Sequence, residues 1–419
     1  MMARFCTYCE KVFALSDLVG SLTEPRDNPM IPLEAFWAAT FAMYATARNS
    51  LNALDIEMKI PKRLDGVVGA RKPSGDRLGE VYELVRPDEQ RKMLLSIVKK
   101  LRRNKALNNE WPYVFVALDG HEFFRSKHRS WDHCSTRTIH LKDTDVTEYY
   151  QRGVVAHLVG FDIPVPLDVE MILPGEDEIA AAKRVTKRLT DNYPELFDGV
   201  IVDALYFEAP FVNFCLDLGK HVVGVVKGKD RLLLQDAEGV FSSLEPEVWK
   251  PRPNQQIEVW EAEGFKSFDG VDEAIRVLHT QETTVKRERI DREWTEKVDI
   301  KNWWWFSTLP TFLLPTHVLW EVGHARWEIE DDLFNVLVSY WGMNHCFRYH
   351  PVAMVNFILT LFITFILLQC FYCRNLKPQM RKRFSTIISF KDELHGSLPV
   401  AFRFKPPWLC GGMTAPMPP

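Results

Sequence analysis

The sequence predicts a mixed α/β protein with a central sheet flanked by helices. Three observations support this prediction. Residues 1–110 carry apolar side chains at helical spacing. From residue 113, short unbroken apolar runs, typical of buried strands, alternate with amphipathic helical segments. Residues 230–316 then contain several short alternating runs, typical of half-buried strands, before a final helical pattern.

The N-terminal 110 residues are predicted to be a helical region. Residues 33–54 are rich in Ala, Phe, Trp and Leu at helical spacing, and residues 87–104 form a strongly amphipathic pattern. The end of the second pattern is basic, with Lys99, Lys100, Arg102, Arg103 and Lys105. Cations in this position complement the helix macrodipole, and they are equally suited to contact nucleic-acid phosphates.

Residues 111–229 show a definite order of strands and helices. Apolar runs predict strands at 113–118, 137–142, 153–160 with a continuation through 165–173, 200–203 and 222–226. A helix with acidic residues in its first turn is predicted from 175 to 190, and a short helix at 211–218. Three strands, a helix, a strand, a helix and a strand, with one more helix much later, is the order of an RNase H-like core.

Residues 230–316 are predicted to be a β-rich insertion between the fifth strand and that last helix. The runs that suggest this are 232–234, 257–260, 283–290 and the block Trp303-Trp-Trp-Phe306. Residues 317–390 would complete the core, and residues 391–419 are expected to be a loose tail. The predicted fold is therefore an RNase H-like mixed sheet flanked by helices, with a helical region before it and a β-rich insertion inside it.

Composition and charge narrow the partners and the compartment. The chain has 419 residues, of which 46% are hydrophobic and 26% charged, as in an ordinary globular protein. Its net charge of -4 provides no global basic field, so a DNA partner would require local patches of cations. Eight cysteines in a chain of this length do not indicate a disulfide framework. Cys6-x-x-Cys9 and Cys370-x-x-Cys373 have zinc-like spacing but lie at opposite ends of the chain, so a reduced cytosolic protein is the default expectation.

An uncharged segment, residues 352–372, leaves two interpretations open. Its length and the cations that follow it are typical of a transmembrane helix. Asn356, Thr360 and Thr364, however, recur every four residues and form a polar stripe, which a helix enclosed in a protein core would also show. The start of the chain contains charges and no uninterrupted apolar run, so no signal peptide is expected.

Three carboxylates are candidates for a metal-dependent active site. Asp119 and Asp203 each follow an apolar run, at the carboxyl end of a predicted buried strand. A single aspartate there is more often a loop acid or a helix cap. The first and fourth strands of an RNase H-like core are neighbours, however, and a divalent cation would relieve the repulsion between the two carboxylates. Glu330 lies on the late helical pattern. A ligand set of carboxylate oxygens suits Mg²⁺ or Mn²⁺ rather than Zn²⁺.

Two charged residues near Glu330 have alternative interpretations. Arg326 lies one helical turn before Glu330 on the same face. It is either half of a surface ion pair or an arginine that orients the glutamate or holds a phosphate. Glu328 lies about 200° away around the same helix, which makes it the less favoured ligand.

Further residues are candidates for contact with DNA. Lys227 and Lys229 follow the fifth strand, where they would either touch phosphates or lie in a solvated turn. Trp304, in the aromatic block, would either stack on a flipped base or pack in the core of the insertion.

A series of motifs, taken in order, resembles DDE-type insertion-sequence transposases. The motifs are Asp119-Gly-His-Glu-Phe-Phe, Thr147-Glu-Tyr-Tyr150, Val155-Ala-His-Leu-Val-Gly160, Pro174-Gly-Glu-Asp-Glu178, Asp203-Ala-Leu-Tyr206 and Arg326-Trp-x-Ile-Glu330-x-x-x-Phe334. Their order and spacing are specific together, and the resemblance extends over residues 70–385. It implies an RNase H-like catalytic core with a β-strand insertion, a DNA-binding region within residues 1–110, and a divalent metal. It also implies that Asp119, Asp203 and Glu330 form the catalytic triad, with Arg326 beside them.

The chemistry expected of such a protein is phosphodiester cleavage and strand transfer. Two ions, Mg²⁺ or Mn²⁺, would clamp the scissile phosphate and activate a water or a 3′-hydroxyl. The expected partner is double-stranded DNA, both transposon ends and target, bound by a homodimer in the cytoplasm in association with the nucleoid. The resemblance also implies that the apolar helix packs on the core sheet and does not enter a membrane.

The sequence departs from the family pattern at several positions. Gly323 stands where the family often has Tyr, and Leu337 and Val338 stand where it usually has Lys. Gln151 follows the tyrosine pair in place of a frequent His. Two alternatives therefore remain: a catalytically silent relative that only binds DNA, and a membrane-anchored protein held by residues 352–372.

Overall fold

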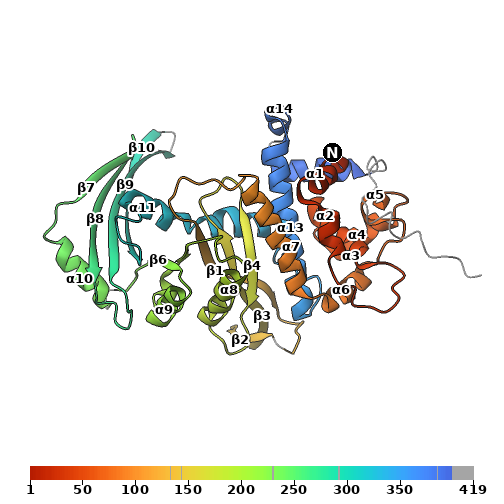
Figure 1. Cartoon of the computed structure of the whole chain (residues 1–419), viewed down its shortest axis with the longest axis horizontal. Helices are drawn as coiled ribbons and strands as arrows, with labels where there is room; N and C mark the ends of the chain where they lie inside the picture. Colours follow the sequence, from red (N-terminus) through yellow and green to blue (C-terminus); the bar gives the residue numbers. More distant parts are fainter. Residues whose placement is uncertain (133, 143, 229–230, 291–292, 385, 399–419) are drawn as a thin grey trace, which may run out of the picture.

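The computed structural model describes residues 1–398, except 133, 143, 229–230, 291–292 and 385. The molecule is elongated, with the insertion at one end, the core sheet in the middle and the N-terminal helices at the other end (Figure 1). The described residues form a ten-stranded mixed sheet with helices on both sides. The predicted RNase H-like α/β fold is therefore confirmed.

The core of the sheet has the strand order β2-β3-β1-β5-β6. The strands are β1 (Phe115–Ser126), β2 (Ser135–His140), β3 (Asp145–Leu158), β4 (Val165–Met171), β5 (Gly199–Val202) and β6 (His221–Val225). β1 pairs antiparallel with β3 and parallel with β5, and β5 pairs parallel with β6. Helices α8 (Glu178–Asn192) and α9 (Ala209–Asp217) make the connections from β4 to β5 and from β5 to β6.

Two strand predictions in the core were wrong in extent. The third predicted strand does not continue through 165–173, because the chain turns at Gly160, which has φ +80, and β4 returns antiparallel to β3. β1 is longer than predicted and runs to Ser126, because its second half remains paired with β3.

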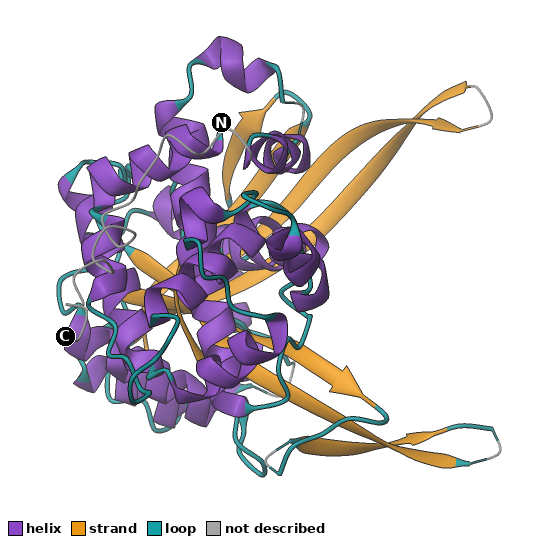
Figure 2. Ribbon diagram, turned by 90° about the vertical axis from the view of Figure 1, so that its right-hand side faces the viewer, coloured by secondary structure: helices purple, strands orange, loops and turns teal. Residues whose placement is uncertain are grey.

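The insertion extends the core sheet. Its strands are β7 (Glu247–Arg252), β8 (Gln255–Phe265), β9 (Ile275–Ile290) and β10 (Glu293–Ser307), and β10 pairs antiparallel with β6. β9 and β10 form a long hairpin that projects from the molecule (Figure 2). The run 232–234 was expected to be β and instead begins the helix α10 (Leu232–Phe241), whose buried Leu233, Leu234, Ala237 and Phe241 recur at helical spacing.

The N-terminal region is helical, as predicted. Its helices are α1 (Met2–Phe13), α2 (Leu15–Gly20), α3 (Leu33–Ala45), α4 (Leu51–Lys59), α5 (Asp65–Val68), α6 (Gly75–Leu84) and α7 (Pro87–Arg103). Three of them, α3, α6 and α7, pack against the apolar helix α13 (Pro351–Cys370), which also contacts strand β4. α13 thus joins the helical region to the sheet.

The polar stripe of α13 is hydrogen-bonded within the protein. The Asn356 amide donates to the carbonyls of Tyr82 (2.9 Å) and Val85 (2.8 Å). The Thr360 hydroxyl donates to Gln90 Oε1 at 2.7 Å. Together with the π-helical turn η3 (Phe371–Asn375), α13 is the one helix in the described residues that is long and apolar enough to cross a membrane, and its most apolar window is 83% buried. A buried polar stripe with internal partners is what the core-helix interpretation predicts.

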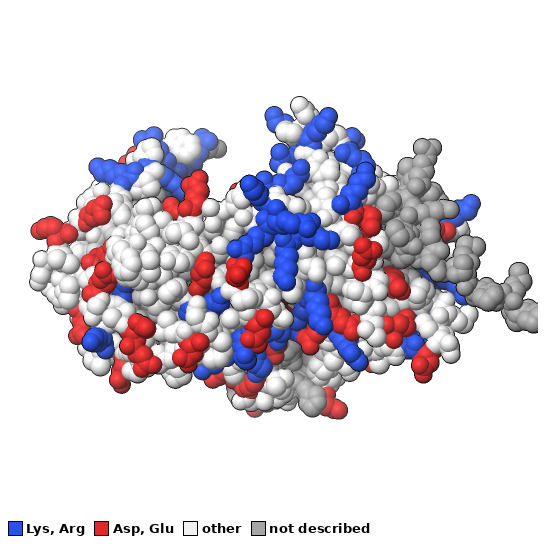
Figure 3. Space-filling model, in the orientation of Figure 1, with Lys and Arg blue, Asp and Glu red and all other residues white. Residues whose placement is uncertain are grey.

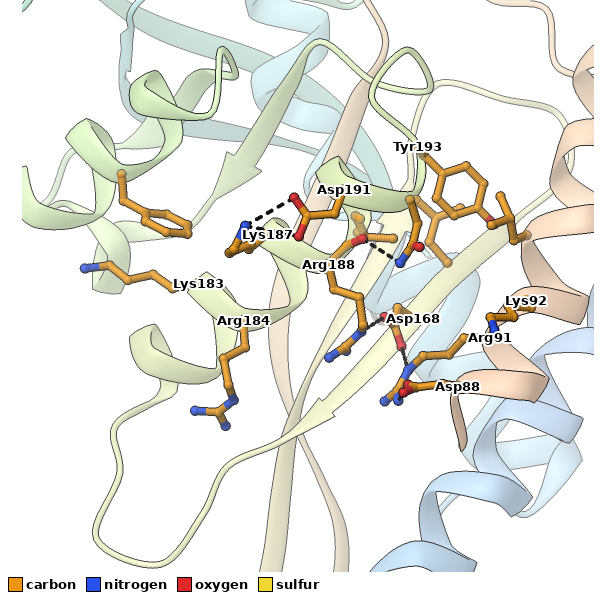
Figure 4. Close-up of a pocket in the computed structure, with 15 residues that line it drawn as sticks. Asp88, Arg91, Lys92, Asp168, Lys183, Arg184, Lys187, Arg188, Asp191 and Tyr193 are labelled. Atoms are coloured by element: carbon orange, nitrogen blue, oxygen red, sulfur yellow. Dashed lines mark hydrogen bonds and ion pairs between the residues drawn. The ribbon is translucent and has the colours of Figure 1, made fainter. Parts of the chain in front are cut away.

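A charged groove marks the contact between the N-terminal helices and the core. It has a volume of about 650 Å³ and lies between α7 and α8 (Figure 4). At its base Asp168 of β4, only 2% exposed, accepts hydrogen bonds from Arg91 of α7 (2.8 Å) and Arg188 of α8 (2.7 Å). These ion pairs tie both helices to one strand.

The C-terminal segment is partly folded. After α14 (Pro378–Lys382), α15 (Ile387–Gly396) begins at a Thr386 capping box and buries Phe390 and Leu394. The expectation of a loose tail from residue 391 is therefore wrong for residues up to 396, and residues 399–419 lie outside the described part of the chain. Ser397 accepts a hydrogen bond from the backbone of Met2 at 2.8 Å, so the two ends of the described chain meet.

Candidate active site

The two candidate aspartates lie at the point where β1 and β5 separate. The last paired residues of these strands are Ala117 and Ile201, and β5 ends one residue later. Asp119 was predicted to end its strand, and this prediction was wrong. The residue lies inside β1, where it is paired only with Val155 of β3. Asp203 follows β5 and caps the short 3-10 helix η1 (Ala204–Tyr206), accepting from the backbone of Leu205 at 2.8 Å. The edge of β1 that β5 leaves open therefore faces the site.

Glu330 reaches the same place from the late helical segment. α11 (Thr316–Ala325) is followed by a turn and by the π-helical turn η2 (Ile329–Phe334), and then by α12 (Asn335–Trp341). Arg326, between α11 and η2, is 5% exposed. Its Nη1 lies 3.1 Å from Glu330 Oε1 and 3.6 Å from Asp119 Oδ2. Its guanidinium also lies 4.0 Å from the centre of the Trp327 ring. One buried arginine therefore joins two of the three candidate carboxylates.

Negative charges outnumber positive charges around Asp119. Burial raises the pKa of Asp119 to about 7, although Arg326 opposes this shift. The negative charges of Glu330, Asp203 and Glu178 raise the pKa further. Asp203 thus lies close enough to act on Asp119, and a single guanidinium does not neutralise the group. Such a site favours either a proton or a second cation.

Glu328 has a different environment from Glu330. Its Oε2 accepts a hydrogen bond from the backbone of Gly160 at 2.8 Å, and burial raises its pKa to about 7. The structure therefore brings Glu330, and not Glu328, to Asp119 and Arg326.

The donor set fits a divalent cation. In the described part of the chain, no group of three or more His, Cys, Asp or Glu side chains already lies in ligating geometry. Asp119 and Glu330 share the guanidinium of Arg326 instead. The three carboxylates nevertheless offer only oxygen ligands, and Asp119 is largely enclosed beside three other acids. Asp119, Asp203 and Glu330 are the residues that would hold Mg²⁺ or Mn²⁺.

Gly323 is explained by the packing of Trp305. A Cβ atom at Gly323 would lie 2.6 Å from Trp305 Nε1 and 2.7 Å from Trp305 Cε2. The Trp305 side chain is 1% exposed and fills the space beside α11. The tyrosine that the family often has at this position would therefore collide with the indole.

The other departures from the family pattern also have local roles. Gln151 is buried, and its amide donates to the carbonyls of Ile172 (2.8 Å) and Arg152 (2.9 Å), which holds β3 to the chain after β4. Leu337 is fully buried in α12. A lysine at 337 would therefore point into the core.

The residues predicted to contact DNA lie in three places. Arg102, Arg103 and Lys105 are exposed at the end of α7, where Arg102 donates to the carbonyl of Glu195. Lys227 is exposed after β6, and Lys229 lies outside the described residues. Trp304 stacks on His279 of β9 (ring centres 3.9 Å apart) and on Phe241 of α10 (5.7 Å). The packing alternative for Trp304 is thus the arrangement that the structure contains.

Fold and site together describe an RNase H-like protein whose candidate carboxylates gather where β1 and β5 separate. This arrangement is the one that the motifs implied for a DDE-type transposase. The model of the transposase DDE domain family matches residues 113–367, more than half of the chain, so the chain belongs to this family. No curated protein matches the chain. Transposases act on DNA, and the DDE family generally depends on divalent metal ions.

Proposed function

We propose that this protein is an active DDE transposase, which cleaves transposon ends and joins the freed strand to target DNA with a divalent metal. One observation carries the proposal. Asp119, Asp203 and Glu330 come from three distant segments, and Asp119 lies beside both of the others around the buried Arg326. A surface ion pair would not require burial of the arginine or convergence of three acids.

The side chains have distinct proposed tasks. When bound by the three carboxylates, Mg²⁺ or Mn²⁺ supplies Lewis-acid activation of the attacking and leaving oxygens. Asp119 must release its proton to serve as a ligand, and its raised pKa makes that release dependent on pH. Arg326 holds Glu330 in place and balances part of the negative charge before DNA enters.

A basic surface supports DNA as the partner. The exposed cations at the end of α7 are Lys99, Arg102, Arg103 and Lys105, and those after α13 are Arg374, Lys377, Lys382 and Arg383. We call these eight residues the α7–α14 basic surface. Arg374 donates to the carbonyl of Ala106 at 3.3 Å, so the two groups are neighbours although they are far apart in sequence. Figure 3 shows Lys and Arg gathered over the middle and upper part of this face.

In the sequence alone, the cations that follow α13 are also typical of the residues that flank a transmembrane helix. In the structure they adjoin the α7 cations, and the helix that precedes them is enclosed by protein. Duplex DNA, whose phosphates attract such a surface, is the partner that the family favours. We propose that α13 is a core helix and does not enter a bilayer.

Salt dependence tests the DNA surface. Binding to a duplex of random sequence should weaken steeply with salt, because each neutralised phosphate releases counterions. Reversing Lys377, Lys382 and Arg383 to Glu should reduce the slope by about 3. Reversing Lys59 and Arg77, which lie on α4 and α6, is the control and should leave the slope unchanged. Equal slopes in all variants, or binding to anionic vesicles in preference to DNA, would overturn the assignment.

Nicking of a supercoiled plasmid tests the activity. The wild-type chain should nick the plasmid with Mg²⁺ or Mn²⁺ and be inactive in EDTA. Binding without nicking in either metal would establish the second candidate, a silent DNA-binding relative, which the departures at Gly323 and Leu337 favour.

We further propose that the protein is cytoplasmic and nucleoid-associated and that it acts as a homodimer on paired DNA ends. Light scattering with and without duplex DNA would test the dimer.

A further inference from the structure

Glu178 is a fourth carboxylate at the candidate active site. It begins α8, is 7% exposed, and contributes to the raised pKa of Asp119. A first-turn acid usually serves the helix end. Here Asp177 already caps α8, because its side chain accepts from the backbone of Ala180 at 2.7 Å. The burial of a second acid at this position is therefore not explained by the helix.

The contacts of Glu178 lead to both candidate aspartates. Its Oε1 accepts from the Tyr206 hydroxyl at 2.9 Å, and Tyr206 ends the short helix that Asp203 caps. On the other side the carboxylate lies directly against Gly120, which follows Asp119. A Cβ atom at Gly120 would be 2.1 Å from Glu178 Oε2, so only glycine leaves room for the carboxylate.

Arg152 completes the arrangement. Its Nη2 lies 2.5 Å from Glu178 Oε2, and its side chain is 43% exposed. The carboxylate thus has one buried neutral donor and one partly solvated cation. A buried carboxylate costs free energy unless it is paired, and a partly solvated partner compensates only part of that cost. The negative charge of Glu178 that remains uncompensated acts on the neighbouring Asp119.

We propose that Glu178 is a positioning residue for the metal-binding carboxylates. It holds the segment after Asp119 and the segment after Asp203 at a fixed separation, and its charge strengthens the attraction of the site for a divalent cation. This inference rests on the proposed metal-dependent function. The alternative is a purely structural role, in which the ion pair between Glu178 and Arg152 only ties α8 to β3.

Two substitutions separate the alternatives. Glu178→Gln keeps an acceptor for Tyr206 and removes the charge. Binding of Mn²⁺ to the full-length protein, measured by calorimetry without DNA, should weaken about tenfold, as for other residues that orient metal ligands. Melting in EDTA should change little, because the hydrogen bond to Tyr206 survives. Arg152→Gln, which removes only the solvated partner, should change Mn²⁺ affinity less than Glu178→Gln.

Glu176→Gln is the matched control. Glu176 lies two residues away, pairs with Arg184 and accepts from the backbone of Leu173 at 3.0 Å, away from both aspartates. Its substitution should leave Mn²⁺ affinity unchanged.

Gly120→Ala provides an independent approach. The added methyl group should displace the Glu178 carboxylate and weaken Mn²⁺ binding, and Glu178→Ala in the same chain should relieve the clash without restoring affinity.

The outcomes are distinguishable. Lower melting in EDTA with unchanged Mn²⁺ affinity in Glu178→Gln establishes the structural ion pair and overturns the proposal. Unchanged melting and unchanged affinity overturn it as well. If the wild-type chain binds no Mn²⁺ and Asp119→Asn makes no difference, the proposed metal-dependent function fails first, and the role of Glu178 fails with it.

Discussion

Arg326, in the turn before η2, lies 3.6 Å from Asp119, which belongs to the first core strand, β1. The same guanidinium nitrogen is 3.1 Å from Glu330. The arginine therefore occupies the place where the acids of the site converge. This contact accounts for both the burial of Arg326 and the way Glu330 is brought to the sheet.

Removing any of the three carboxylates should abolish cleavage. We expect Asp119→Ala, Asp203→Ala and Glu330→Ala each to lose nearly all metal-dependent nicking, because each removes a ligand of the proposed metal site. DNA binding should be largely retained, since none of the three carboxylates belongs to the α7–α14 basic surface proposed to contact DNA. Glu328→Gln is the control, because Glu328 bonds to Gly160 and does not contact Arg326. Loss in Glu328→Gln with activity in Glu330→Ala would identify Glu328, and not Glu330, as the catalytic glutamate.

Arg326→Gln should destabilise the metal-free protein and make it more dependent on metal. The substitution leaves Asp119 and Glu330 without their shared cation, which should lower the free energy of unfolding by about 1–3 kcal/mol. Because the proposed divalent ion would supply positive charge at the same place, Mg²⁺ should raise the melting temperature more in Arg326→Gln than in wild type. The same change at Arg287, whose ion pair with Glu296 is exposed, should cost less than about 0.5 kcal/mol. Equal Mg²⁺ effects in wild type and variant would contradict the shared role.

Two helical glycines should respond in opposite ways to alanine. Gly323→Ala should destabilise by about 1–3 kcal/mol, because the new Cβ meets Trp305. Gly239→Ala in α10, where nothing lies within 4 Å of the added atom, should stabilise by up to about 1 kcal/mol. Chemical denaturation measures both. Trp305→Ala combined with Gly323→Tyr should be less unstable than the sum of the two changes, because the tyrosine can occupy the vacated space.

Asn356→Leu distinguishes a core helix from a membrane helix. In the protein core it removes donors to Tyr82 and Val85, and each unpaired buried carbonyl should cost about 1–3 kcal/mol. In a bilayer the same change would favour insertion. We expect lower stability of a protein that purifies without detergent and is released by a carbonate wash. A wild-type chain that remains in the membrane pellet would reverse the conclusion.

His157 should make the fold sensitive to acid. It is 1% exposed on β3, and burial lowers its pKa to about 3. The unfolded chain therefore binds a proton that the folded chain rejects. The stability that depends on a neutral His157 is fully present above about pH 6.5. Below that pH the free energy of unfolding falls by up to about 1.4 kcal/mol per pH unit, until the pH reaches the pKa of His157 in the folded protein. His157→Leu should flatten this slope by one proton in denaturation measured from pH 7 to 4, whereas exposed His140→Gln should not. The same slope in His157→Leu would remove this histidine as the cause.

The sequence by itself determined the class of fold, most strand and helix positions, the candidate carboxylates and the preference for Glu330. These follow from local periodicity and from motif order, which are properties of short segments. It also contained the stripe Asn356, Thr360 and Thr364, but the partners of that stripe lie in the N-terminal helices.

Only the tertiary structure decided which distant residues meet. The contact of Glu178 with Gly120 and Tyr206, the fit of Trp305 beside Gly323, and the hydrogen bond from Arg374 to Ala106 after α7 all depend on packing between segments far apart in the chain. The run that begins at Leu232 became a helix because its buried face recurs with helical period over a length that three residues could not reveal. Side-chain pattern reports which face of an element is buried, whereas the neighbour that covers it is selected by the shape and charge of the whole fold.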